Sequence, residues 1–277
     1  MPELPEVETV RRTLLDLVVG KTISTVIVSW GKIIKKPNEV DEFQILLKGQ
    51  KIENINRRGK FLLFELNDFT LVSHLRMEGK FRVFPTEEPV APHTHVRFLF
   101  EDGTELRYQD VRKFGTMHLF NKGEENEGPP LAKLGPEPFS DEFTAGYLGE
   151  KLKNTNRKIK VVLLDQNLVV GLGNIYVDEV LFRAKIHPET PASSLKPEQI
   201  KLLAETITET LQEAVDLGGS TIRSYVNSQG KVGTFQDIIK VYGRKGLECH
   251  NWGQPIEKIT VGGRGTSFCP VCQPKKN

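Results

Sequence analysis

Residues 95–110, HVRFLFEDGTELRYQD, determine the fold of the N-terminal half of the chain. Two runs rich in β-branched and aromatic residues flank Asp102-Gly103, a pair typical of tight β-hairpin turns. Short segments of the same kind, separated by turn signals, recur from about residue 22 to residue 120: KTISTVIVSW, KFLLFELND, FTLVSHL and TMHLF. Regularly spaced antiparallel segments of this kind predict a β-sandwich or a β-barrel.

The chain changes character after this β-rich half. Residues 121–140 contain NKGEENEGPP and LGPEP, which are poor in apolar residues and typical of a connection between domains. Residues 141–217 have a helical pattern, clearest in KPEQIKLLAETITETLQEAVDLGG, where Lys196-Pro197 marks a start and Gly218-Gly219 a stop. The Gly/Ser-rich segment that follows predicts no regular structure, and the tail contains every cysteine. We expect three domains, at residues 1–132, 133–237 (including the irregular segment 218–237) and 238–277.

Composition and charge exclude some classes of protein. The 277 residues include 27% charged side chains, which is ordinary for a soluble surface. No apolar run approaches the roughly 20 residues of a membrane span, and the N-terminus lacks the pattern of a secretory signal. The three cysteines all follow residue 248, which argues against a disulfide framework and for a cytoplasmic protein. The net charge is only +2, so binding to a polyanion would require local clustering of basic residues.

Basic residues do cluster, in RRGK (57–60), in Arg112-Lys113 and in the run from Lys151 to Lys160. Such runs are usually solvated surface. Here apolar and glycine residues interleave them, and RRGK lies at a strand entry where cations and backbone amides could face a phosphate together. Neutralising several phosphates would then supply affinity through counterion release.

Two glycine-containing turns are further candidates for phosphate binding. GLGN (171–174) lacks the third glycine of a dinucleotide loop, and no alternating strand–helix units surround it, so we reject that interpretation. A turn between helices that directs backbone amides and Asn174 at a phosphate fits better, with a simple tight turn as the alternative. In VGGRGTSF, glycines on both sides of Arg264 suit a tight turn that exposes one guanidinium. This motif alone favours an ordinary solvent-exposed turn arginine, although arginine is also the best side chain for bidentate phosphate contact.

The cysteine tail resembles half of a metal-binding ribbon. Cys269-Pro-Val-Cys272 has the spacing that lets two thiolates reach one tetrahedral zinc ion, and Cys249 lies upstream. The position expected for a fourth cysteine holds Trp252. Either three thiolates and a further ligand, with His250 the nearest candidate, hold zinc, or the metal is weak or absent and Trp252 packs a metal-free hairpin.

The N-terminal stretch MPELPEVETVRR combines a helix start with an unusual tip. From Pro5 onward, early acidic residues and regularly spaced apolar residues predict a helix. If Met1 is removed, Pro2 becomes the N-terminus, and an α-amino group has a pKa of about 7.7–8.0, so part of it is neutral and nucleophilic. Attack on a sugar C1′ would give a cationic iminium, with Glu3 moving protons and Glu6 orienting Glu3. A frayed terminus is the alternative.

These residues also carry a resemblance. The chain resembles the bacterial formamidopyrimidine-DNA glycosylases, which excise oxidised purines such as 8-oxoguanine, in PELPEVETVRR, RRGKFL, SHLRMEGKFR, DVRKFGT, LGPEP, LLDQ, GLGNIYVDEVLFRAKIHP, GGSTIRSY, VYGR and VGGRGT…CPVC. The resemblance implies an α+β multidomain protein: an N-terminal β-sandwich, a helix–two-turn–helix domain and a C-terminal zinc-finger-like β-hairpin, with DNA in the cleft between domains. It implies base-excision repair by a bifunctional glycosylase and AP lyase that uses a Pro2 Schiff base and β,δ-elimination.

The resemblance also assigns roles to individual residues. The implied catalytic residues are Pro2, Glu3, Lys60 and Arg264. Implied DNA contacts are His74, His93, Arg112, Lys160, Asn174 and Tyr242, with Asn174 and Arg264 as phosphate clamps. The residues implied to fill the gap left by an extruded base are Met77, Arg112 and Phe114, for which core packing and a surface ion pair are the alternatives.

The segment 218–237 corresponds to the family's lesion-recognition loop. The residues implied to read the flipped base are Glu78, Ser220, Arg223 and Tyr225. Cys249, Cys269 and Cys272 correspond to the ligands of one structural Zn²⁺, and Trp252 is the clear departure from the family pattern. We expect double-stranded DNA carrying oxidised purines or abasic sites as the partner, no membrane, no protein partner and a monomer. The rivals are a relative that acts on oxidised pyrimidines and a catalytically inactive binding protein.

Overall fold

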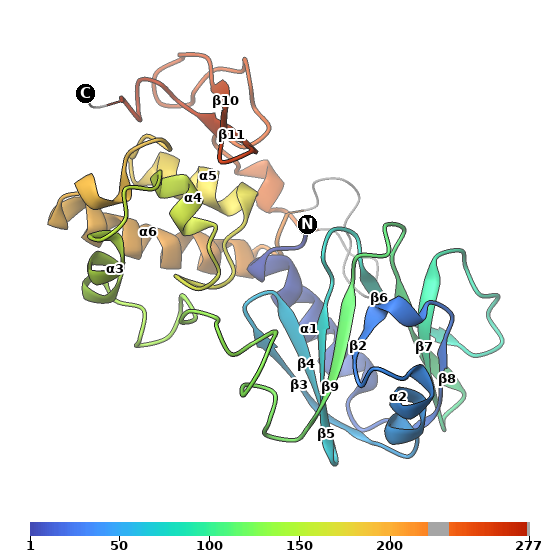
Figure 1. Cartoon of the computed structure of the whole chain (residues 1–277). Coiled ribbons are helices and arrows are strands. Elements are labelled where there is room, and N and C mark those ends of the chain that lie inside the picture. Colours follow the sequence, from blue (N-terminus) through green and yellow to red (C-terminus); the bar gives the residue numbers. More distant parts are fainter. Residues whose placement is uncertain (221–232, 276–277) are drawn as a thin grey trace. The chain divides into compact units, whose positions relative to one another are not determined.

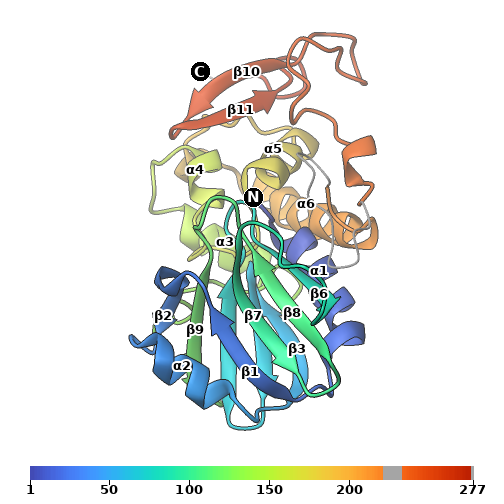
Figure 2. The same cartoon turned by 90° about the vertical axis from the view of Figure 1, so that its right-hand side faces the viewer.

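The Asp102-Gly103 turn joins two antiparallel strands, as the sequence predicts. In the computed structural model, which describes residues 1–220 and 233–275, β7 (Thr94–Phe100) pairs with β8 (Thr104–Gln109). Gly103 has a φ of +80°, a backbone conformation that glycine adopts without steric cost. Two further strands, β1 (Ile23–Val28) and β6 (Lys80–Pro85), complete a four-stranded sheet in the order β1-β7-β8-β6 (Figure 2).

A second sheet faces the first. Its order is β2-β9-β5-β4-β3, and all its pairs are antiparallel except β2 with β9. The strands are β2 (Ile34–Lys36), β3 (Ile52–Arg58), β4 (Phe61–Leu66), β5 (Phe69–His74) and β9 (Thr116–Asn121). Two separate sheets make this a β-sandwich, so of the two predicted architectures the barrel is excluded.

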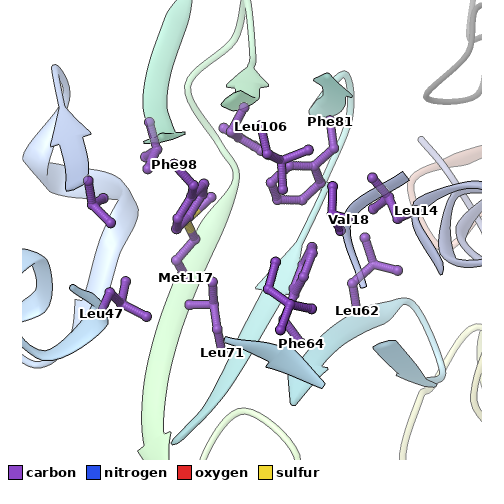
Figure 3. Packing of buried hydrophobic residues seen from close by; sticks show 14 of the residues in the cluster. Leu14, Val18, Leu47, Leu62, Phe64, Leu71, Phe81, Phe98, Leu106 and Met117 are labelled. Atoms are coloured by element: carbon purple, nitrogen blue, oxygen red, sulfur yellow. The ribbon is translucent and has the colours of Figure 1, made fainter. Parts of the chain in front are cut away.

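The core of the sandwich lies between the two sheets (Figure 3). Phe81 of β6 forms edge-on contacts with Phe64 of β4 and with Tyr108 of β8, at ring-centroid distances of 5.3 and 5.0 Å. Helix α1 (Leu4–Val18) adds Val7, Val10, Leu14 and Val18 to the same core. Its apolar face therefore holds the N-terminus against the sandwich. The short elements η1 (Gly31–Ile33) and α2 (Val40–Leu47) precede and follow β2, and α2 packs against β1 and β2.

The second half of the chain is helical, as predicted, and ends in a small hairpin (Figure 1). Helix α6 begins at Pro197 and ends at Asp216, next to the predicted start and stop signals. The remaining elements are α3 (Ala145–Leu152), α4 (Ile159–Leu163), α5 (Asn174–Arg183), η2 (Ala192–Ser194), η3 (Phe235–Asp237), β10 (Glu257–Val261) and β11 (Arg264–Phe268). Strands β10 and β11 pair antiparallel, and α5 packs against both α6 and β11.

Two units divide the chain. The first comprises Met1–Lys133 and the described residues at both ends of Gly218–Gly233, and the second comprises Leu134–Leu217 and Thr234–Asn277. The described part of 218–237 is thus shared between the units. Among the helices within residues 1–220 and 233–275, none combines the length and the apolar character that a membrane span requires.

Candidate active site

The N-terminal tip is held by a helix cap. Glu3 is the N-cap residue of α1, and its backbone N–H donates to Glu6 Oε2 at 2.8 Å. Glu3 and Glu6 are 2% and 3% exposed, and Pro2 is also buried. A tip that is capped and buried is not frayed. The structure thus places the buried Pro2 next to the cap, and the cap fixes the backbone of Glu3, the predicted acid/base.

Glu6 also binds the start of the predicted lesion-recognition segment. Its Oε1 accepts hydrogen bonds from the Ser220 backbone N–H at 2.7 Å and from the Ser220 hydroxyl at 3.1 Å. Ser220 is 4% exposed, so these bonds are buried. One carboxylate therefore connects the tip with the segment predicted to read the base. Arg223 and Tyr225, the other two predicted residues of that segment, lie outside the described residues.

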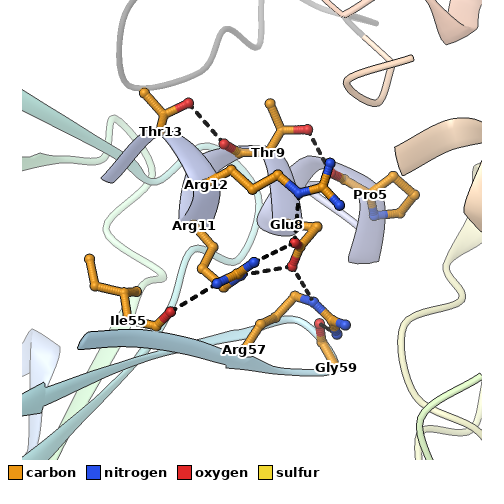
Figure 4. A network of polar contacts seen from close by, with 9 residues as sticks. All are labelled: Pro5, Glu8, Thr9, Arg11, Arg12, Thr13, Ile55, Arg57 and Gly59. Carbon is orange, nitrogen blue, oxygen red and sulfur yellow. Dashed lines mark hydrogen bonds and ion pairs between the residues drawn. The ribbon is translucent and has the colours of Figure 1, made fainter. Parts of the chain in front are cut away.

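A second carboxylate, Glu8, connects α1 to the RRGK turn (Figure 4). It pairs with Arg11 at 2.8 Å, Arg12 at 2.9 Å and Arg57 at 3.1 Å, and Arg57 Nη1 donates to the Gly59 carbonyl at 3.0 Å. Burial raises the pKa of Glu8, but the bonds and charges of the arginines outweigh burial and lower that pKa to about 2. Arg57 thus holds the turn before Lys60, whereas the sequence suggested that it faces a phosphate.

We expect Glu8 to make the stability of the protein depend on pH. The folded-state pKa of about 2 is below the ordinary value of 4.5, so the contribution is complete above about pH 4.5 and disappears as the pH falls toward 2. Glu8→Gln should lower the free energy of unfolding at pH 7 by about 1–3 kcal/mol. Denaturant titrations of both proteins should converge only as the pH approaches 2. A difference that does not shrink on acidification would contradict this role.

Lys60 and His74 lie at the same end of the neighbouring strands β4 and β5. Lys60 precedes β4, is 6% exposed and follows Gly59, which has a φ of +56°. His74 ends β5 and is paired in register with Phe61. Burial, and then the charges of Arg76 and Lys60, lower the pKa of His74 to about 3. The ring is therefore neutral, and its Nδ1 accepts the Arg76 N–H at 2.9 Å, which leaves the N–H on Nε2.

The predicted gap-filling residues lie on two loops of the first unit. Phe114 is 52% exposed, Arg112 stacks on it with a distance of 4.8 Å from Cζ to the ring centroid, and Met77 is half-buried. The alternative of core packing is therefore wrong for Phe114. Glu78, next to Met77, is exposed, and so is His93 on the segment before β7.

Asp110 and Tyr108, which sequence reasoning missed, organise these loops. The buried Asp110 carboxylate accepts the backbone N–H groups of Arg112, Phe114 and Gly115 at 2.9–3.0 Å. A Cβ added at Gly115 or Gly79 would lie 1.7 or 2.2 Å from the Tyr108 hydroxyl. Both glycines let the two loops close around this tyrosine. The only sequence signal was an acidic residue directly before the VRKFG stretch.

The Asp110 backbone extends the same arrangement toward His93. Its N–H donates to the His93 carbonyl at 3.0 Å, and its carbonyl lies 2.8 Å from His95 Nε2. Asp110 therefore positions both the loop that carries Arg112 and Phe114 and the backbone at the exposed His93.

In the second unit, Arg264 is exposed at the first position of β11, after the positive-φ glycines 262 and 263. A Cβ at Gly262 would lie 2.6 Å from Val161 Cγ2, so the turn packs closely on α4. Asn174, the first residue of α5, donates from Nδ2 to the Gly265 carbonyl at 2.9 Å. The structure thus brings the two predicted phosphate clamps close together, with Asn174 at the start of α5 and Arg264 at the start of β11.

Lys160 is placed differently from the prediction. Its side chain is 0% exposed, and its ammonium lies 2.6 Å from Asp178 Oδ1 and 3.2 Å from the Gly265 carbonyl. Asp178 Oδ2 accepts the Ser267 N–H at 2.9 Å. Because this ammonium is buried in an ion pair, the structure supports a role in positioning the Arg264 turn rather than direct contact with DNA.

The neighbouring carboxylate of α5, Glu179, holds Tyr242. It accepts the backbone N–H groups of Lys240, Val241 and Tyr242, each at 2.9 Å, and is fully buried. Sequence reasoning missed Asp178 and Glu179, although two consecutive acidic residues in an otherwise apolar helix are a recognisable signal for buried acceptors.

The three cysteines form one buried cluster. Their sulfur atoms lie within 4.8 Å of one another, and Cys249 Sγ is 3.8 Å from Cys272 Sγ. Tetrahedral zinc with Zn–S bonds of about 2.3 Å separates its thiolates by about 3.8 Å, so the donors fit zinc in type and spacing. His250 is exposed and does not belong to the cluster, and Trp252 is 70% exposed. Of the alternatives that the sequence left open, the structure therefore places neither His250 beside the three sulfurs nor Trp252 in the packing of the hairpin.

Comparisons with known proteins agree with this geometry. Residues 1–117 match the family model for the formamidopyrimidine-DNA glycosylase N-terminal domain, 134–226 match its H2TH domain, and 246–275 match the zinc finger found in FPG and IleRS. The finger match and the cysteine cluster together establish one structural Zn²⁺.

Whole-chain relatives give the same result. The formamidopyrimidine-DNA glycosylases of Halalkalibacterium halodurans and Bacillus cereus (strain ATCC 14579) are each 64% identical, over 99% of this chain and all of theirs. The solved complex of Lactococcus lactis Fpg with DNA containing an abasic site superposes with a TM-score of 0.93 at 46% identity, over 99% of this chain and all of that one. A second complex of that enzyme, with DNA containing N7-benzyl-Fapy-dG, gives the same score and identity. The chain therefore belongs to the formamidopyrimidine-DNA glycosylase family.

Proposed function

We propose that the chain is a base-excision repair enzyme, a bifunctional DNA glycosylase and AP lyase that removes oxidised purines from duplex DNA. The observation that carries the proposal is the capped, buried tip, in which Glu6 holds the Glu3 backbone at 2.8 Å and Ser220 at 2.7 Å. The whole-chain relatives and the lesion-bearing DNA in their solved complexes support the same activity.

Removal of Met1 would make the Pro2 nitrogen a free secondary amine. Its lone pair forms a bond to C1′ while the glycosidic bond breaks, and the proton that the nitrogen then loses leaves with the base. Glu3 protonates the ring oxygen as the sugar opens, which gives the iminium. The cationic nitrogen then accepts electron density as the C2′ proton is lost and the 3′ phosphate leaves, and a second elimination releases the 5′ phosphate.

Residues of both units would contact the DNA. In the second unit, the exposed Arg264 and the neighbouring Asn174 would bind phosphates, and Tyr242 would contact the DNA backbone. In the first unit, the neutral His74 would contact the DNA backbone, and Lys60 would lie close to the sugar. Phe114, Arg112 and Met77 would fill the gap left by the extruded base, and His93 and Glu78 border the same loops. Ser220, with Arg223 and Tyr225, would read the base.

The organisation of the chain fits this activity. We propose that residues 1–132 carry the chemistry, that 133–237 bind DNA and read the lesion, and that 238–277 present Arg264. The zinc ion supplies no chemistry to the reaction: Cys249, Cys269 and Cys272 would hold it as a structural support for the hairpin. We propose that the protein acts as a monomer in the cytoplasm.

Borohydride trapping tests the function against its rivals. The protein that begins at Pro2 is incubated with borohydride and duplexes carrying 8-oxoguanine opposite cytosine, an oxidised pyrimidine, or no lesion. We expect a covalent adduct that forms fastest on the 8-oxoguanine duplex. Faster trapping on the pyrimidine duplex would indicate the other substrate class, and tight lesion binding with no adduct on any duplex would indicate a binding protein.

A further inference from the structure

The two turns that carry the cysteines have the same backbone hydrogen bond. In the first, the Gly253 N–H donates to the Cys249 carbonyl at 2.8 Å, and in the second, the Gln273 N–H donates to the Cys269 carbonyl at 2.9 Å. The second turn places its other cysteine, Cys272, three residues after the first. The equivalent position of the first turn is Trp252. The first turn therefore keeps the conformation of a two-ligand turn although it supplies one ligand.

The two turns offer four ligand positions, and the three that are not Trp252 hold thiols arranged as metal ligands. All three are buried, the Cys272 N–H lies 3.4 Å from Cys269 Sγ, and Asn251 Nδ2 lies 3.6 Å from Cys272 Sγ. Hydrogen bonds from N–H groups to sulfur favour the thiolate form that binds metal. Phe182, Val241 and Ile256 pack around the same sulfurs and hold them in place.

Among residues 1–220 and 233–275, no histidine, further cysteine or carboxylate joins the three thiols as a fourth ligand. The indole of Trp252 carries an N–H donor and no lone pair for a metal, and its 70% exposure places it in solvent. Structural zinc sites normally close their shell with four protein ligands.

We infer that the zinc of this chain is bound by three thiolates and that its fourth position is filled by an exchangeable water molecule. The zinc ion would support the hairpin, as structural zinc does. Its fourth position would nevertheless be open to small monodentate ligands, as in catalytic zinc sites. The metal should therefore leave more readily than from a four-thiolate site, and an added thiol should bind it directly.

Cobalt substitution of the full-length protein tests this inference. Co²⁺ takes the same site, and its thiolate charge-transfer absorption scales with the number of bound thiolates. Four proteins are compared, each checked for folding by circular dichroism: the natural chain, Trp252→Cys, Trp252→Ala and His250→Ala. Trp252→Ala removes the indole without adding a ligand, and His250→Ala removes the histidine next to Cys249 in the sequence.

We expect Trp252→Cys to raise the charge-transfer absorption by about a third, from three thiolates to four. Zinc transfer to a chelator should become roughly 10-fold slower or more. Trp252→Ala and His250→Ala should keep the spectrum of the natural chain. Added 2-mercaptoethanol should shift that spectrum toward that of Trp252→Cys, and should leave Trp252→Cys itself unchanged.

Three results would overturn the inference. If Trp252→Cys leaves the spectrum and the zinc transfer rate unchanged, the natural shell is already complete. If His250→Ala changes the cobalt spectrum, an imidazole is the fourth ligand. If metal analysis of the natural chain finds neither zinc nor cobalt at stoichiometric levels, the three thiols do not hold a metal.

Discussion

Replacing Glu3 by glutamine is expected to slow both base release and strand cleavage by about 10²–10⁴-fold, the usual contribution of a positioned general acid or base. Glutamine has nearly the same shape as glutamate but cannot gain or lose a proton at neutral pH. The backbone N–H of residue 3 would still donate to Glu6, so the helix cap should persist. Single-turnover kinetics on an 8-oxoguanine duplex would measure the loss.

The control is Glu101→Gln, the same change at an exposed position on the β7–β8 turn. It should leave the rate unchanged, and Glu3→Gln should bind the lesion duplex about as tightly as the natural protein. A Glu3→Gln enzyme that retains more than about a tenth of the natural rate would show that another group moves the proton.

Gly219→Ala is expected to separate excision of a damaged base from cleavage at an abasic site. Gly219 has a φ of +76°, and an added Cβ would lie 2.8 Å from Glu6 Oε1. The alanine therefore disturbs the carboxylate that holds Ser220. Excision requires the base to be read, whereas an abasic site presents no base. We expect the rate on 8-oxoguanine to fall at least about 10-fold, equivalent to about 1.4 kcal/mol, with a much smaller change on the abasic duplex.

Gly49→Ala is the matched control. Gly49 has a similar φ of +83°, but an added Cβ meets nothing within 4 Å. Both variants place an alanine at a positive φ, which costs about 1 kcal/mol of backbone strain. Only Gly219→Ala also brings the added Cβ too close to Glu6. Equal rate losses for the two variants, or equal losses on both substrates for Gly219→Ala, would contradict the proposed connection through Glu6.

Local signals in the sequence predicted local structure well. Asp102-Gly103 predicted the β7–β8 hairpin, and Lys196-Pro197 and Gly218-Gly219 predicted the ends of α6. The glycines beside Arg264 predicted an exposed arginine on a tight turn. Each of these features depends on the backbone preferences of two or three neighbouring residues, which a sequence displays directly.

Features that depend on distant partners could not be predicted. Lys160 belongs to a basic run, but Asp178, on the next helix, takes its ammonium into the interior. Arg57 stands in RRGK, but Glu8 of α1 pairs with it. Asp110 is an acceptor for three backbone N–H groups of a loop whose shape the sequence does not reveal. In each case the fold determines which group lies next to a buried charge, and the spacing of residues along the chain does not predict it.

The residue to which the trapped nucleotide is attached gives the most direct test of whether the Pro2 nitrogen is the nucleophile. Two forms of the protein are prepared from a cleavable fusion, one that begins at Pro2 and one with a single glycine before Pro2, which converts the proline nitrogen into an amide. Both are reacted with an 8-oxoguanine duplex and borohydride, digested and analysed by mass spectrometry. We expect the first form to carry the sugar adduct on Pro2 and the second form to carry none. An adduct of equal yield in both forms, or one attached to another residue such as Lys60, would contradict this expectation.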